Sequence, residues 1–336
     1  MTNPSSAPTP PTGTPLRHFL RDDDLSPAEQ AEVLDLAAAL KAAPFETKSL
    51  AGPRTVATIY DKPTLRTQVS FAAGIAELGG HPMLVEGSLA GIGVRESVAD
   101  IARILGRQAA LIVWRTYHQS WLEEMADYAG VPVINALTDD FHPCQLLADL
   151  LTIREHKGRL AGLTVTFVGD GACNMGNSWV LAGATAGMHV RVSSPAGFEP
   201  AADHVQRARE IAADTGGSVS LAADPDTAVE GADVVVTDTW VSMGKENEAR
   251  ARRVAFASYQ VDQTLLDRAA PDAVVLHCLP AYRGKEITAE VIDGPRSLVW
   301  DEAENRRHAQ KAIMTWLITR PGAAERLSSQ AGQARR

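Results

Sequence analysis

Residues 55–71 read TVATIYDKPTLRTQVSF. A β-branched apolar run gives way to a polar loop, and a helix follows that opens with two threonines and an arginine. This order of strand, loop and helix recurs along the chain and is typical of parallel sheets flanked by helices. It predicts further strands at HPMLVEG (81–87), AALIVWR (109–115), VPVIN (131–135), LTVTFVGD (163–170), HVRVSS (189–194), SVSLAAD (218–224), DVVVTDTW (233–240), AVVLHCLP (273–280) and SLVW (297–300).

The predicted fold class is therefore α/β, with two doubly wound parallel-sheet domains. A length of 336 residues exceeds what one core usually serves, and a long helical segment at 142–158 joins the two halves. We expect a first domain at 16–150 and a second at 151–301. A helix at about 302–319 should pack back on the first domain, and residues 1–15 and 320–336 are poor in core-forming side chains and are expected to be disordered.

The composition excludes several classes of protein. A formal charge of −9 argues against nucleic-acid binding, which needs a surplus of lysine and arginine on some face. Three cysteines in a long chain make a disulfide framework improbable and favour the cytoplasm. The first fifteen residues resemble neither a signal nor a transit peptide, and no 18-residue apolar run predicts a membrane span.

Polar clusters follow several predicted strands, where ligands of open α/β sheets bind. After the first strand, Thr64 and Thr67 offer hydroxyl groups and Arg66 offers a forked cation at a helix start, where free N–H groups suit a phosphate. Taken alone, this motif is equally an ordinary helix cap with a solvated arginine. Arg115 ends an almost wholly apolar strand. A charge at such a position favours a functional role for its side chain.

His142 and Gln145 open the long joining helix. An imidazole can donate to a carbonyl oxygen, and an amide can bind a carbamoyl NH₂ group. A lone histidine at a helix start is otherwise held by backbone hydrogen bonds. The segment GDGACN is similar to the glycine-rich fingerprint of dinucleotide-binding domains. However, Asn174 replaces the last glycine of that fingerprint, and the next strand ends without the acid that would bind a ribose. Both differences disfavour a nicotinamide cofactor.

Cys278 follows the last long strand. A thiolate there could act as a nucleophile, and a zinc site from His142, Cys144, His277 and Cys278 is a further alternative. Adjacent residues of a strand point to opposite faces, so the spacing disfavours zinc. We predict no metal at this site.

Seven motifs occur in order: DKPTLRTQVSF, VWRT, FHPCQ, GDGACNMGNS, DTWVSMG, HCLPA and EAENR. Together they closely resemble the ornithine carbamoyltransferase family, over about residues 16–317. The resemblance implies transfer of the carbamoyl group of carbamoyl phosphate to L-ornithine, giving L-citrulline and phosphate, without a cofactor. It also implies a homotrimer, or a multiple of trimers, and a place in arginine biosynthesis, although the sequence leaves a catabolic or secondary role open.

The resemblance assigns roles to individual residues. Those implied for carbamoyl phosphate are Thr64, Leu65, Arg66, Thr67, Arg115, His142, Gln145, Cys278, Leu279 and Arg306. Those implied for ornithine are Asn174, Asp238, Ser242 and Met243. The catalytic set is Arg66, Arg115, His142, Asp238 and Cys278. Donors fixed around the carbonyl oxygen would stabilise the charge that develops there when the amine attacks. The polar segment 245–253 is expected to be a mobile lid.

Besides Thr64, which keeps a hydroxyl group, the chain departs from the family pattern at three positions. The usual Ser-Thr-Arg-Thr-Arg reads Thr64-Leu65-Arg66-Thr67-Gln68, and Gly91 stands where the family commonly has a glutamine that reaches a neighbouring subunit. We expect weaker carbamoyl phosphate binding. Three alternatives stay open: a different acceptor such as acetylornithine, putrescine or lysine, a weakly active carbamoyl phosphate-binding relative, and a nucleotide-binding oxidoreductase.

Overall fold

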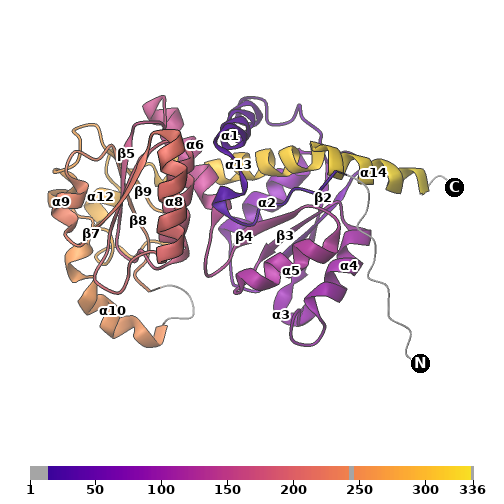
Figure 1. Cartoon of the computed structure of the whole chain (residues 1–336), viewed down its shortest axis with the longest axis horizontal. Coiled ribbons are helices and arrows are strands. Elements are labelled where there is room, and N and C mark those ends of the chain that lie inside the picture. Colours follow the sequence, from indigo (N-terminus) through magenta and orange to yellow (C-terminus); the bar gives the residue numbers. More distant parts are fainter. Residues whose placement is uncertain (1–13, 242–245, 334–336) are drawn as a thin grey trace.

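Two parallel sheets form the frame of the molecule, in a computed structural model that describes residues 14–241 and 246–333 (Figure 1). The first has the order β2-β1-β3-β4, and the second β7-β6-β5-β8-β9. The strands are β1 (Thr55–Tyr60), β2 (His81–Glu86), β3 (Leu111–Arg115), β4 (Val133–Leu137), β5 (Thr164–Val168), β6 (His189–Ser193), β7 (Ser218–Ala222), β8 (Val234–Thr237) and β9 (Val274–Leu276). The predicted α/β class with two parallel sheets is confirmed.

Helices cover both sheets, so their strands are largely apolar. Every residue of β3, inside the first sheet, and of β4, at its edge, is buried, as expected of parallel strands packed on both faces. The longer helices are α1 (Pro27–Ala42), α2 (Arg66–Glu77), α4 (Val98–Gln108), α5 (Gln119–Ala129), α6 (Pro143–Lys157), α7 (Asn174–Thr185), α8 (Ala202–Thr215), α13 (Val299–Thr319) and α14 (Pro321–Gln333). The shorter ones are α3 (Gly87–Ala90), α9 (Pro225–Val229), α10 (Ala249–Ala255), α11 (Gln263–Leu266) and α12 (Ala289–Ile292).

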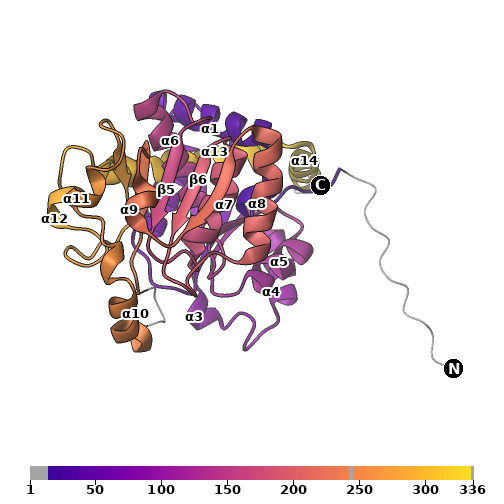
Figure 2. The ribbon, with the colours of Figure 1, turned by 60° about the vertical axis from the view of Figure 1, so that its left-hand side comes forward.

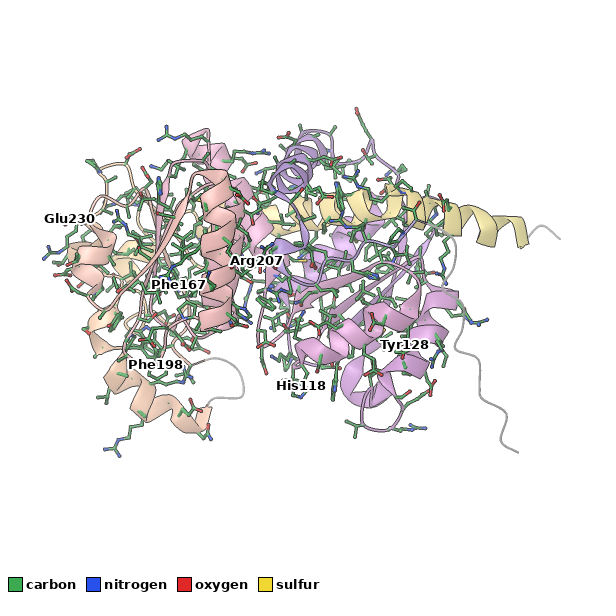
Figure 3. The ribbon with its side chains drawn as sticks, viewed as in Figure 1. His118, Tyr128, Phe167, Phe198, Arg207 and Glu230 are labelled. Atoms are coloured by element: carbon green, nitrogen blue, oxygen red, sulfur yellow. The ribbon has the colours of Figure 1, made fainter. Side chains whose placement is uncertain are left out.

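Helices α6 and α13 join the two sheets. They pack against each other next to α1 (Figure 2), and α13 also contacts α2 of the first domain and β9 of the second. One hydrophobic core runs through this junction, with Val113 of the first sheet and Phe167 of the second in the same buried cluster. Figure 3 shows Phe167 among the side chains of the second domain. The carboxyl ends of both sheets are therefore held in a fixed relation.

Two expectations were wrong near the carboxy terminus. The run SLVW forms no strand: Ser297 makes a single bridge to Val275, and Val299 already begins α13. A short apolar run cannot be told from the start of a buried helix by its pattern alone. Much of the expected disordered tail is helix α14, whose Ala323 is buried.

The segment expected to form a lid is partly helical. Residues Glu246–Glu248 form a 3-10 turn and α10 follows. Arg252 of α10 donates from Nη1 to Asp170 Oδ2 at 2.5 Å and from Nε to Glu248 Oε2 at 2.8 Å. This ion pair attaches the segment to the loop after β5. Among the described helices, none combines the length and apolar content needed to cross a membrane.

Candidate active site

The loop between β1 and α2 lies beside the end of β3. Tyr60, the last residue of β1, is in register with Arg115, the last residue of β3. The carboxyl ends of neighbouring parallel strands share an edge, so the Arg115 backbone is adjacent to the loop that leads to α2. At the start of that helix the Thr67 N–H donates to Thr64 Oγ1 at 3.4 Å. The predicted phosphate-binding segment and Arg115 thus lie at the same edge of the first sheet.

Helix α13 brings Arg306 to this loop. Its Nη2 donates to Thr67 Oγ1 at 3.0 Å, and its Nη1 donates to Gln145 Oε1 of α6. Thr67, Gln145 and Arg306 are all buried. Three predicted residues from segments far apart in the sequence therefore meet at one point.

Positive charge at this point is buried and uncompensated. Burial, together with the charges of Arg306 and Arg66, lowers the pKa of Arg115 to about 10. Burial also lowers the pKa of Arg306. Within the described residues, neither Arg115 nor Arg306 has an ion pair with a carboxylate, and the Nε atom of each is buried without a partner. Such cations are costly unless an anion joins them, which fits a site for a phosphate group.

His142 caps the start of α6 and is neutral. Burial lowers its pKa well below the usual value, and the charges of Arg306 and Arg115 act in the same direction. Its ring atom Nδ1 is buried without a hydrogen-bond partner in the described structure. A neutral imidazole can donate to a substrate oxygen without adding charge. The ring is therefore suited to polarising a carbonyl group.

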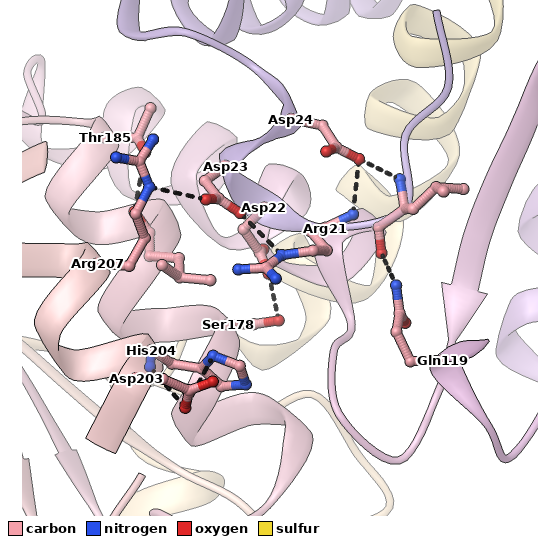
Figure 4. A network of polar contacts seen from close by, with 12 residues as sticks. Arg21, Asp22, Asp23, Asp24, Gln119, Ser178, Thr185, Asp203, His204 and Arg207 are labelled. Carbon is pink, nitrogen blue, oxygen red and sulfur yellow. Dashed lines mark hydrogen bonds and ion pairs between the residues drawn. The ribbon is translucent and has the colours of Figure 1, made fainter. Parts of the chain in front are cut away.

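The backbone of His142 is held by an interdomain network. Its N–H donates to Ser178 Oγ at 2.9 Å, and Ser178 Oγ donates to Asp22 Oδ2 at 2.5 Å, in the network drawn in Figure 4. Asp22 belongs to the 3-10 helix η1 (Asp22–Asp24), whose Asp23 accepts from Arg207 Nε of α8 at 3.1 Å. The start of α6 is thereby attached to α7 and, through η1, to α8.

One loop after β9 connects the two ends of the site. Arg66 Nη2 donates to the carbonyl oxygen of Leu279 at 2.7 Å, and Cys278 Sγ donates to Asp238 Oδ1 at 3.3 Å. Leu279 has a φ of +58°, a left-handed conformation that is strained for leucine, and its N–H donates to His277 Nδ1 at 3.0 Å. Strain of this kind often occurs at functional sites. Arg66 and Asp238 therefore contact consecutive residues of one loop.

The second end of the site carries one unpaired acid. Asp238 follows β8, and burial raises its pKa. It accepts from the Thr239 N–H at 2.7 Å but has no ion pair with a described cation. Burial and the neighbouring Asp238 raise the pKa of Cys278 well above the usual value, so its thiol stays protonated. This disfavours a covalent thiolate mechanism and leaves a carboxylate suited to an ammonium group.

Asn174 begins α7 and points across the junction. Its Nδ2 donates to the carbonyl oxygen of Thr138 in the first domain at 2.8 Å. Ser242 and Met243 lie outside the described residues.

The geometric argument against a metal was wrong at one step. Ligand atoms of Asp238, His277 and Cys278 all lie within 4.8 Å of one another. Strand β9 ends at Leu276, so the alternation of side chains does not continue into the next two residues. Both ring nitrogens of His277 are already engaged, one by the Leu279 N–H and the other by Glu286 at 3.3 Å. That engagement leaves the histidine poorly suited to binding a metal.

The three departures from the family pattern lie around the first sheet. Leu65 precedes α2 and is exposed, and Gln68 is half-buried on the helix. Gly91 follows α3 with a φ of +64°, and a Cβ atom there would lie 2.9 Å from Arg95 Cβ. The backbone at this position is therefore unsuited to the glutamine found elsewhere in the family.

Sequence reasoning missed two buried acids. Gln145 Nε2 donates to Asp149 Oδ1 at 2.7 Å and to Glu302 Oε1 at 2.9 Å. The signal was present, because QLLAD and EAENR each place two polar residues four apart on one helix face. Lys62 was also missed; it is buried, stacks over Tyr117 and pairs with Asp139.

A cavity of about 220 Å³ lies beside the second end of the site. It is lined by residues 239–241, Ala249, Arg253, Tyr282, Lys285 and Glu286. Of the predicted site residues that the structure describes, none lines this cavity, which borders the segment that follows Asp238.

Two family profiles cover almost the whole described chain. The carbamoyl-P binding domain of aspartate/ornithine carbamoyltransferase matches residues 17–155, and the Asp/Orn binding domain matches residues 161–317. The chain belongs to the aspartate/ornithine carbamoyltransferase family. Its two sheets correspond to these two family domains.

Relatives and solved structures agree with this membership. The chain is 63% identical over 302 residues to ornithine carbamoyltransferase of Clavibacter michiganensis subsp. michiganensis, covering 90% of this chain and 98% of the relative. The crystal structure of ornithine carbamoyltransferase from Gloeobacter violaceus matches with a TM-score of 0.81 and 45% identity, over 90% of this chain and 98% of that one. The Pyrococcus furiosus enzyme matches with a TM-score of 0.85 and 42% identity, over 90% and 97%.

Proposed function

We propose that this member of the carbamoyltransferase family is an ornithine carbamoyltransferase, which converts carbamoyl phosphate and L-ornithine to L-citrulline and phosphate. One observation carries the proposal. Arg66 and Asp238, the cation of one end and the acid of the other, contact the consecutive residues Leu279 and Cys278. An acyl phosphate held by the first end would present its carbonyl carbon to an amine held by the second.

The first end would bind the phosphate group. The N–H groups of residues 64–67, with the hydroxyl groups of Thr64 and Thr67, suit phosphate oxygens at a helix start. The guanidinium groups of Arg66 and Arg306 supply charge, and phosphate binding would relieve the burial cost of the cations. Leu65 would contribute only its backbone.

The carbonyl group would be polarised from several sides. Thr67, Arg115 and neutral His142 would donate to its oxygen, where negative charge develops as the amine attacks. Gln145 Oε1 and the backbone near Cys278 and Leu279 would accept from the carbamoyl NH₂ group. The amine lone pair forms the new C–N bond, the C–O bond to phosphate breaks, and the released phosphate carries away the electron pair with the proton that the amine loses.

The second end would orient ornithine. The carboxylate of Asp238 and the hydroxyl of Ser242 would take the α-ammonium group, while Asn174 and the Met243 backbone would hold the main-chain atoms. An acceptor without a free α-amine would leave Asp238 buried and unpaired, which favours a free α-amino acid. The chemistry needs neither a cofactor nor a metal.

The test is a colorimetric ureido assay with carbamoyl phosphate and a panel of ornithine, acetylornithine, putrescine and lysine. We expect product with ornithine and at least about 100-fold less with the other three amines, because each lacks or alters a group that the site binds. A preference for acetylornithine or putrescine would show that the preferred amine, and not ornithine, is the acceptor substrate. No product with any amine would favour a binding protein that turns carbamoyl phosphate over poorly.

We also propose a homotrimer or a multiple of trimers. Strand β2 is at the edge of the first sheet, and exposed apolar side chains surround it: Leu65, Val69, Leu84 and Leu89. Such a patch commonly marks a protein interface. Light scattering coupled to size exclusion should give three chains or a multiple of three for the native protein and a smaller species for Leu84→Glu. A monomeric native protein would contradict the proposal.

The remaining proposals concern location and boundaries. We propose a cytoplasmic enzyme of arginine biosynthesis, supported by three free cysteines among the described residues. We propose residues 16–150 as the carbamoyl phosphate-binding domain and 151–301 as the ornithine-binding domain. Helix α13 packs against α1 and α2 of the first domain, which supports assigning about residues 302–319 to that domain.

A further inference from the structure

Gln145 is held by three hydrogen bonds that fix which way its amide faces. Its Oε1 accepts from Arg306 Nη1, at the phosphate end of the site. Both hydrogens of its Nε2 point away from that end, toward Asp149 Oδ1 at 2.7 Å and Glu302 Oε1 at 2.9 Å. Gln145, Asp149 and Glu302 are at most 1% exposed, so water does not compete for these contacts.

The four residues form a matched set on two packed helices. Gln145 and Asp149 are four residues apart on α6, and Glu302 and Arg306 are four residues apart on α13. Residues at this spacing lie on one helix face, so each helix presents one acid together with one residue that contacts the other helix. The set is therefore a single hydrogen-bonded unit at the junction of the two domains.

We propose that Asp149 and Glu302 are positioning residues that hold the oxygen of Gln145, rather than its NH₂, toward the carbamoyl group and so select a carbamoyl over an acetyl donor. The inference rests on the proposed function, because it assigns Gln145 to the carbamoyl NH₂ group. A carbonyl oxygen has two lone pairs, of which Arg306 takes one. The second would accept from a substrate NH₂, which an acetyl group lacks.

Hydrogen bonding assigns the proton of the acid pair to Asp149. Glu302 uses both oxygens as acceptors, one from Gln145 and the other from the His277 N–H at 2.9 Å. Asp149 Oδ2 is buried without a hydrogen-bond partner among the described residues, and the charges of the two carboxyl groups act on each other. A carboxyl O–H of Asp149 that donates to ionised Glu302 satisfies every group. Burial raises the pKa of both acids, that of Glu302 well above its usual value, so the pair holds a proton, and the donors to both Glu302 oxygens place that proton on Asp149.

This assignment predicts opposite results for two conservative substitutions. Asp149→Asn keeps an acceptor for Gln145 and replaces the O–H donor with an N–H donor. Glu302→Gln leaves one acceptor oxygen where two are needed, so either Gln145 or the His277 N–H loses its partner and the Gln145 amide is free to turn over. Glu155→Gln is a matched control, because Glu155 lies on α6 and contacts Lys41 and Asn305 instead.

The experiment measures binding of three probes by calorimetry, without turnover. Phosphonoacetamide carries the carbamoyl NH₂, acetonylphosphonate carries a methyl group in its place, and inorganic phosphate carries neither. We expect Glu302→Gln to weaken the binding of phosphonoacetamide about tenfold, which corresponds to the loss of about one buried hydrogen bond. The affinities for the other two probes should change by less than about twofold. Asp149→Asn and Glu155→Gln should leave all three within about twofold.

Uniform weakening of all three probes by Glu302→Gln would show a merely structural role and overturn the inference. A selective loss in Asp149→Asn equal to that in Glu302→Gln would also overturn it. If Glu302→Gln does not fold, Asp149→Leu removes one acceptor of the Gln145 amide and should weaken phosphonoacetamide selectively, by about threefold or more. A native protein that distinguishes the amide probe but forms no citrulline would refute the proposed function alone.

Discussion

The two ends of the site are opposite in charge and alike in what they lack. Helix α2 contributes Arg66, β3 contributes Arg115 and α13 contributes Arg306, but none of these cations has an ion pair with a described carboxylate. The second sheet contributes Asp238, which has no ion pair with a described cation. Each end carries a buried charge that only a ligand of the opposite sign would balance. The comparison indicates that unpaired buried charges lower the stability of the ligand-free protein at both ends and favour ligand binding there.

Removing a cation from the first end should have the largest effect. We expect Arg115→Met to lower kcat about 10²- to 10³-fold, because a donor to the carbonyl oxygen is lost. The same variant should raise the free energy of unfolding by about 1–2 kcal/mol, since an unpaired buried charge is replaced by an apolar chain of similar length. Rates of citrulline formation and urea denaturation measure the two changes.

The control for this variant is Arg103→Met, which removes an exposed arginine that pairs with Asp100 on α4. Its stability should change by less than about 0.5 kcal/mol and its activity should stay the same. A destabilised Arg115→Met would mean that the cation is compensated without a ligand, and the comparison between the two ends would fail.

Removing the acid from the second end tests the other half of the comparison. We expect Asp238→Asn to lower kcat/KM for ornithine about 10- to 100-fold, the usual worth of a charge-assisted hydrogen bond. The KM for carbamoyl phosphate should stay within about twofold, because that substrate contacts the opposite end. Steady-state kinetics with each substrate varied in turn give both values, with Asp226→Asn as an exposed control. Equal losses for both substrates would show that the two ends are not separate.

The acid pair between the two ends should make stability depend on pH. Asp149 has a folded pKa raised to about 7 from 3.8, so the folded state holds its proton over a range in which the unfolded state has lost it. Stability from this group is therefore full below about pH 4 and falls as the pH rises toward 7. We expect Asp149→Asn to gain at least about 1 kcal/mol relative to the native protein between pH 5 and pH 8. Denaturation at both pH values measures this gain, and an unchanged difference would contradict it.

The sequence predicted the sheets well because parallel strands leave a strong signal. Runs such as LIVWR and TVTFV are rich in apolar and β-branched residues, and polar clusters mark their carboxyl ends. It failed at SLVW, where a short apolar run begins a buried helix, and at α14, whose polar composition hides a helix that packs through Ala323. Local pattern does not report what a segment packs against.

The candidate site was predictable as a set of residues but not as an arrangement. The sequence motifs identified both Gln145 and Arg306, but no sequence pattern predicted the direct hydrogen bond between these residues, which are 161 positions apart. Asp149 and Glu302 were missed because their importance comes from that tertiary contact. The alternation argument at His277 failed for a related reason, since it assumed that the strand continued beyond Leu276.

The smallest expected effect concerns positions at which this chain lacks a polar side chain that its family commonly has around the phosphate. We expect Gln68→Arg to lower the KM for carbamoyl phosphate about threefold, because an added cation near the start of α2 would attract the phosphate group. An unchanged KM would mean that the missing cation is of no consequence. Gly91→Gln cannot serve the same purpose, since its φ of +64° and the nearby Arg95 should cost about 1–2 kcal/mol of stability. Restoring the family's glutamine at this position would therefore need a change in the backbone of the loop as well as the new side chain.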